Sequence, residues 1–179
     1  TTACMINFFG SGPLVIAIPI IVAKTLQGNA IDLSLMHGAF AVGMIIGAVW
    51  IGWLNPQRRR GWYVMGGLIV LGLWLVALSQ VTLLWQGMVI LMLHGICSSV
   101  INIPVFSLIQ EQTDPGKMGR VMSLVMMSAM GLMPLSFGLV ATLLSVGVSV
   151  SSILLVCGVI LVLFTSLILW KAPVLRRVD

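Results

Sequence analysis

Two long stretches without a charged residue constrain the fold of this chain most. Residues 61–110 contain no Asp, Glu, Lys or Arg, and neither do residues 121–170. As a single helix, each stretch would be roughly 75 Å long, whereas the hydrocarbon core of a bilayer is about 30 Å thick. Each stretch is therefore expected to cross a membrane twice. The polar clusters at 79–82 and 145–152 are the predicted turns.

The composition supports a membrane location. Hydrophobic residues make up 60% of the chain and charged residues only 7%, against about 25% charged residues in a typical soluble domain. A net charge of +5 would be compatible with binding to nucleic acid, but such binding needs a polar face that carries the basic residues. Here the charges form short clusters between apolar runs. We therefore expect the lipid bilayer as a partner, and no nucleic acid.

The first 57 residues add two more apolar runs, which brings the number of expected crossings to six. The sequence thus predicts an all-α membrane protein, with residues 1–179 forming a single six-helix transmembrane bundle. The expected spans cover residues of about 3–23, 33–54, 62–78, 83–107, 121–144 and 149–170.

The basic clusters indicate the orientation. Arg58, Arg59 and Arg60 follow the second span, a second cluster lies in the 111–120 loop, and a third follows residue 170. An even number of crossings separates these clusters, and together they hold every Lys and Arg except Lys24. The positive-inside rule then places all three clusters and both termini in the cytoplasm.

Polar side chains within the spans are the candidates for function, because they are costly in hydrocarbon. In the fourth span, His94, Ser98 and Asn102 recur at i, i+4 and i+8, which places them on one helix face. Such residues also hydrogen-bond between helices, contributing about 0.6 kcal/mol each. Packing alone does not require three on one face, so we favour the interpretation that this stripe lines a polar path.

The first span carries Asn7 and Ser11 and is interrupted by Pro13 and Pro19. If the chain is two inverted three-helix repeats, the first and fourth spans occupy equivalent positions. Paired interrupted helices of this kind point to a binding site near the membrane midplane. We therefore predict that Asn7, Ser11, His94, Ser98 and Asn102 line a substrate path.

Other chemistry has little support in the sequence. The spans contain no Asp or Glu, no nucleophile–base pair, no Gly-rich phosphate loop and no metal-ligand spacing. We expect no catalytic residues, metal or cofactor. Gly43 and Gly47, one turn apart in the second span, predict a close contact between two helices.

Two segments carry a resemblance to a known family. The first runs from Gly47 to the Arg58-Arg59-Arg60 cluster and is similar to the loop signature of the major facilitator superfamily, with Asn55 where that signature has an acidic residue. The second runs from Pro104 through Gln110 and a short polar loop to Gly119-Arg120. It resembles the macrolide-efflux and enterobactin-exporter type of drug:proton antiporter within that superfamily.

This resemblance covers the whole chain and identifies it with the C-terminal six helices of such a transporter. It implies a partner half of six N-terminal helices, a small amphipathic or drug-like substrate, alternating access, and export coupled to protons across the bacterial cytoplasmic (inner) membrane. Since the spans lack carboxylates, we expect the proton carrier in the other half and His94 as a neutral hydrogen-bonding group. The alternative is a membrane scaffold or assembly subunit that transports nothing.

Overall fold

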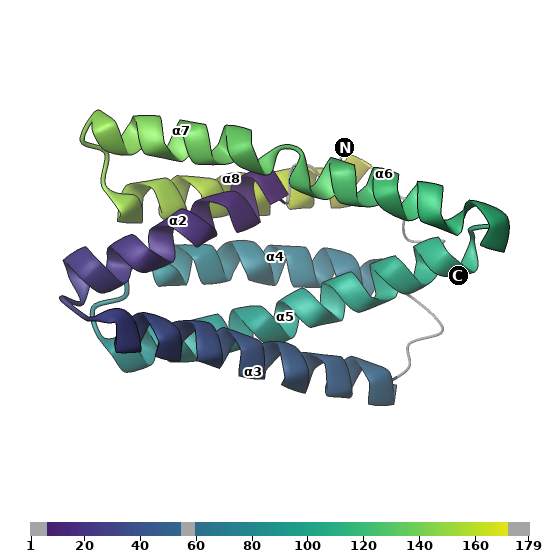
Figure 1. Ribbon diagram of the computed structural model, residues 1–179, viewed down its shortest axis with the longest axis horizontal. Coiled ribbons are helices and arrows are strands. Elements are labelled where there is room, and N and C mark those ends of the chain that lie inside the picture. Colours follow the sequence, from purple (N-terminus) through teal and green to yellow (C-terminus); the bar gives the residue numbers. More distant parts are fainter. Residues whose placement is uncertain (1–6, 55–59, 172–179) are drawn as a thin grey trace.

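The computed structural model describes residues 7–54 and 60–171, and this part of the chain consists of helices and short connections, with no strand (Figure 1). Its elements are η1 (Asn7–Ser11), α2 (Gly12–Ile20), η2 (Ile21–Thr25), α3 (Ala30–Leu54), α4 (Arg60–Leu78), α5 (Leu84–Glu111), η3 (Pro115–Lys117), α6 (Met118–Met130), α7 (Met133–Ser145) and α8 (Val150–Lys171).

Length and composition allow these helices to cross a membrane. Five stretches suffice by both criteria, namely 8–25, 30–54, 84–111, 115–145 and 150–167. The remaining helix, α4, contains the apolar segment Gly66–Leu78, and its 19 residues extend about 28 Å. The all-helical membrane fold expected from the sequence is confirmed. The connections after α4 and α7 lie at residues 79–83 and 146–149, where the polar clusters are.

Proline divides the first span into three pieces. The π-helical turns η1 and η2 flank the nine residues of α2, which has Pro13 in its first turn and Pro19 inside it. Proline has no amide hydrogen to donate, so the regular i to i−4 ladder is interrupted wherever it occurs. The chain here is a helix with two irregular ends rather than one continuous rod.

The fifth span is also divided. The sequence predicts one helix over 121–144, whereas the structure has α6 and α7, separated by a turn at Gly131 and Leu132. Pro134 lies in the first turn of α7 and offers no amide to the carbonyl of residue 130, which explains the position of the break. Gly131 tolerates the change of direction.

The most extensive helix contact joins α3 and α5, which run parallel (Figure 1). A Cβ atom added to Gly43 would overlap the carbonyl oxygen of Met92, and one added to Gly95 would overlap that of Phe40. The two backbones therefore touch, as the glycine pattern predicts. The hydroxyl of Ser99 also donates to the carbonyl of Met44 at 2.8 Å.

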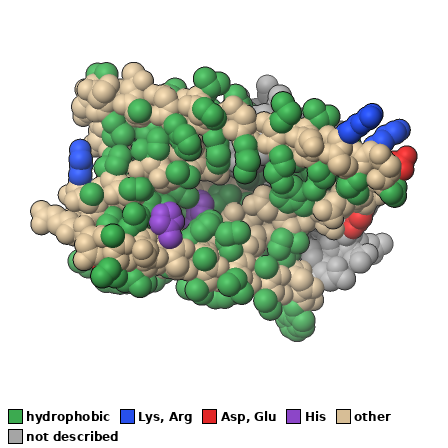
Figure 2. Space-filling view, viewed as in Figure 1, with side chains coloured by type: hydrophobic (Ala, Val, Ile, Leu, Met, Phe, Trp, Pro, Cys, Tyr) green, Lys and Arg blue, Asp and Glu red, His purple; other side chains and the backbone are tan. Residues whose placement is uncertain are grey.

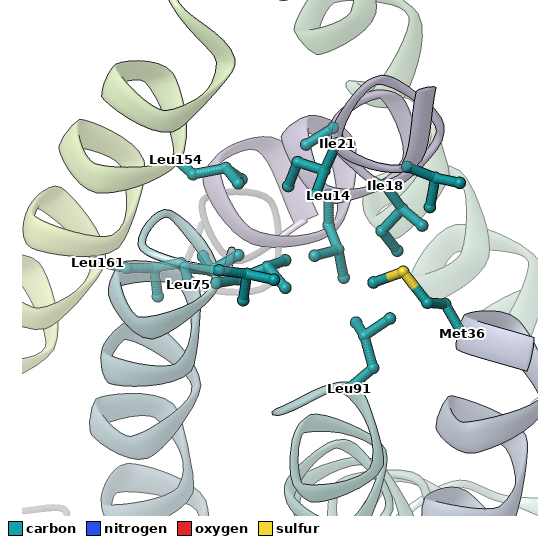
Figure 3. Packing of buried hydrophobic residues seen from close by; sticks show 12 residues of the cluster. Leu14, Ile18, Ile21, Met36, Leu75, Leu91, Leu154 and Leu161 are labelled. Atoms are coloured by element: carbon teal, nitrogen blue, oxygen red, sulfur yellow. The ribbon is translucent and has the colours of Figure 1, made fainter. Parts of the chain in front are cut away.

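The core lies toward the end of the bundle that holds the α2–α3 and α4–α5 connections. Helix α4 packs between α5 and α8, and α2 crosses in front of α8 (Figure 1). Leu14 and Ile18 of α2 point toward Met36 of α3 and Leu91 of α5, both fully buried (Figure 3). The same core cluster includes residues of α4 and α8, so it joins five helices, namely α2, α3, α4, α5 and α8.

The loops that carry basic residues lie at the opposite end. Leu54 and Arg60, which flank the α3–α4 connection, lie at the same end as the α5–α6 loop (Figure 1). In the part of the chain described, Lys and Arg side chains gather at the two ends of the bundle (Figure 2). The long sides of the visible face are mostly apolar, as contact with lipid requires.

Candidate functional site

One face of α5 changes from a buried core surface to an exposed polar surface along its length. Leu91 is fully buried under α2. His94 and Ser98, one and two turns further on, are half-buried, and Asn102, three turns further on, is exposed. The neighbouring Ile101, which turns toward Gly67 of α4, is only 6% exposed. The helix therefore presents its polar stripe on the side that the other helices leave uncovered.

The stripe is tied together within α5. The side-chain amide of Asn102 donates to the carbonyl oxygen of Ser98 at 2.9 Å and to the hydroxyl of Ser98 at 3.2 Å. No described residue donates to the Oδ1 atom of Asn102. This oxygen is an acceptor held in a fixed direction and open to a ligand.

His94 lies against an aromatic side chain rather than a polar one. Its ring centroid is 5.9 Å from that of Phe40 in α3, with the two planes tilted by 42°. The histidine side chains of the chain gather on one face of the bundle (Figure 2). His94 thus combines an apolar contact with ring nitrogens that no described residue hydrogen-bonds.

The two candidates of the first span lie apart from the stripe. Asn7 and Ser11 begin and end η1, which packs mainly on α2, α7 and α8, whereas the stripe belongs to α5. The half-buried Ser11 precedes α2 without capping it through its side chain. The structure thus brings together His94, Ser98 and Asn102, and holds Asn7 and Ser11 on another set of helices.

A buried serine that the sequence analysis did not single out connects this second set. Ser136 of α7 is 1% exposed, and its hydroxyl donates to the carbonyl of Phe8 in η1 at 2.7 Å. A polar residue beside the Pro134 break was the available signal in the sequence.

Charged groups of the described residues lie outside this region. Asp32 caps the start of α3, where its carboxylate accepts the amide of Asn29 at 2.8 Å. Asn29 in turn accepts the amide of Ile31 at 2.8 Å. Glu111 and Asp114 lie at the other end of the bundle. Within the described ranges, no three His, Cys, Asp or Glu side chains come together to hold a metal ion. The site offers neutral hydrogen-bonding groups on an apolar wall.

Comparison with known families decides the class of protein. The family model described as Major Facilitator Superfamily matches residues 1–178. The chain belongs to the Major Facilitator Superfamily. The resemblance to this superfamily, expected from the sequence, is thereby confirmed. Members of this superfamily are membrane transporters. Neither the curated proteins nor the solved structures contain a match to the chain.

Three of the major facilitator loop residues predicted from the sequence belong to described helices that begin at the basic end of the bundle. Gly119 and Arg120 open α6 and are exposed, and Arg60 is the first residue of α4. Arg58 and Arg59 lie outside the described residues.

Proposed function

We propose that this chain is the C-terminal six-helix half of a proton-driven exporter of small amphipathic or drug-like compounds, with Asn7, Ser11, His94, Ser98 and Asn102 along its substrate path. The bundle alternates between two orientations against a second six-helix half around a midplane site. The observation that carries the proposal is the polar stripe of α5, which is half-buried at His94 and Ser98 and exposed at Asn102, beside the buried Ser99 and Ile101.

The geometry of the stripe supports a substrate-binding role. A serine that joins two helices directs its hydroxyl to the neighbouring helix, as Ser99 does toward the carbonyl of Met44. Asn102 and Ser98 instead bond to each other on an uncovered face. Their arrangement leaves the Oδ1 atom of Asn102 free of described donors and suited to a hydrogen-bonding group of a bound compound.

The neutral character of the wall supports an amphipathic substrate. His94, Ser98 and Asn102 offer hydrogen bonds, and the adjoining Phe40 offers apolar contact. The direction of transport rests on the resemblance of the Pro104–Gln110 and Gly119-Arg120 segments to the exporter type. Because Asp32 and Glu111 lie at helix ends and the described helices carry no carboxylate further inside, the proton carrier is assigned to the second half of the transporter.

A transport assay in inverted membrane vesicles tests the proposal. Vesicles that contain the full-length protein and have an interior more acidic than the medium should accumulate ethidium, used here as an amphipathic probe. A protonophore should abolish the accumulation. Asn102→Leu removes the free acceptor and should slow accumulation by about fivefold or more, since one hydrogen bond to a bound group is worth about 1 kcal/mol.

The matched control is Ile103→Leu. Ile103 is also exposed on α5, but it lies about 100° around the helix from Asn102. This variant should transport like the unsubstituted protein. Protonophore-insensitive accumulation would contradict proton coupling, and equal transport by the two variants would remove Asn102 from the path. Absence of accumulation across a panel of amphipathic compounds would favour the scaffold alternative.

A further inference from the structure

We propose that Ser136 is a positioning residue, which fixes the π-helical start of the first span by donating its hydroxyl to the carbonyl of Phe8. Its relevance to transport rests on the proposed function, because η1 carries Asn7 and Ser11. The hydrogen bond itself and its mechanical effect are independent of any substrate.

The bond joins two distant parts of the chain inside the bundle. The Oγ atom of Ser136 lies 2.7 Å from the carbonyl oxygen of Phe8, and the serine is 1% exposed. Other hydroxyls nearby satisfy themselves within their own helix. Thr142 donates to Gly138 and Ser145 donates to Thr142, both at 2.7 Å. Ser136 instead donates its hydroxyl to a carbonyl of η1.

The carbonyl of Phe8 requires an outside donor because of where Pro13 stands. In a π-helix, the carbonyl of residue i accepts the amide of residue i+5. For Phe8 that residue is Pro13, which has no amide hydrogen. Phe8 is half-buried, and a carbonyl without a donor is costly in the hydrocarbon of a membrane, where no water reaches it. The Ser136 hydroxyl supplies the missing donor.

The bond lies beside the irregular segments of both spans. Ser136 is in the first turn of α7, three residues after the helix begins at Met133, and Phe8 is four residues before α2 begins at Gly12. In the first span η1 continues into α2 but with π-helical pairing, and in the fifth span a turn at Gly131 and Leu132 separates α6 from α7. A single hydroxyl therefore sets how the start of the first span sits against α7, and with it the placement of Ser11.

The test measures the accessibility of position 11 in membranes that contain the full-length protein. Cys4, Cys97 and Cys157 are first replaced by alanine, and Ser11→Cys is introduced as the only thiol of this bundle. The rate of its reaction with a small water-soluble methanethiosulfonate reagent is then measured. Adding Ser136→Ala should raise this rate about three- to tenfold. This is the range expected when one intramembrane hydrogen bond is lost and the carbonyl of Phe8 is left without a donor.

Two further variants separate positioning from a general packing defect. Ser145→Ala removes an exposed hydroxyl from the same helix and should leave the labelling rate unchanged. Pro13→Ala restores an amide at the position that π-helical pairing assigns to Phe8. In the Pro13→Ala background, Ser136→Ala should therefore change the rate less than twofold.

The outcomes distinguish this inference from the proposed function. If Ser136→Ala labels like Ser145→Ala, or if its effect is undiminished by Pro13→Ala, the positioning role is overturned. If Ser136→Ala fails to reach the membrane, rescue by Pro13→Ala supports the role and failure of rescue overturns it. Labelling as expected in a protein that transports no amphipathic probe would leave the positioning role standing and remove only the exporter assignment.

Discussion

Replacement of Gly43 by alanine tests the close contact between α3 and α5. The added Cβ would overlap the carbonyl oxygen of Met92 and lie 2.8 Å from its carbonyl carbon and 3.0 Å from its Cα. All three atoms are backbone, so no side chain can rotate away, and the two helices must separate. Overpacking of this kind costs about 1–3 kcal/mol. Separation would also stretch the nearby bond from Ser99 to Met44, a further loss of about 0.6 kcal/mol.

The same substitution at Gly38 is the matched control. Gly38 lies in α3 as well, but a Cβ there would meet nothing within 4 Å. Alanine favours a helix over glycine by about 0.5–1 kcal/mol, so Gly38→Ala should be neutral or stabilising. Unfolding of the purified full-length protein in mixed detergent–SDS micelles gives the free energy of each variant. Equal stability of Gly43→Ala and Gly38→Ala would refute the inferred backbone contact.

Three further outcomes are expected in the full-length protein. A single cysteine at Arg59 should react with an impermeant reagent only from the cytoplasmic side, and one at Gln27 only from the opposite side; the reverse pattern would refute the orientation. A cysteine at Asn102 should react with a small aqueous thiol reagent at least tenfold faster than one at Ile101, which is 6% exposed, and equal rates would leave only a packing role for the stripe. His94→Gln keeps a polar side chain but cannot titrate, so transport should remain proton-driven with similar pH dependence, whereas loss of coupling with retained binding would identify His94 as the carrier.

The sequence was sufficient for features that depend on composition and periodicity. Charge-free stretches indicate helices in lipid because unpaired backbone groups are too costly there. The spacing of His94, Ser98 and Asn102 placed them on one face of α5, where the structure has them. The glycine pair beginning at Gly43 predicted a close approach, although the partner residue Gly95 on α5 emerged only from the structure.

Features that depend on contacts between distant residues could not be predicted. Pro134 signalled an irregularity, but a proline inside a span either kinks a helix or divides it, and the neighbouring packing decides between the two. The bond from Ser136 to Phe8 joins residues 128 positions apart. The position of Ser136 beside Pro134 marks an unusual serine, but no local feature indicates that its hydroxyl donates to Phe8. For the same reason, periodicity did not reveal that η1, which begins at Asn7 and ends at Ser11, packs on α7 and α8.

The parallel arrangement of α3 and α5 has a consequence for how the protein assembles in the membrane. Parallel helices cannot form a hairpin, so the chain must complete α4 and return before α5 can meet α3. Until then, the glycine surface around Gly43 faces lipid, where a groove without side chains makes poor contact. In a two-stage process, in which helices insert first and associate afterwards, the most extensive interface of this bundle therefore cannot form until α5, two helices after α3, has been inserted. Truncation of the nascent chain before Leu84 would leave α3 inserted but without its partner.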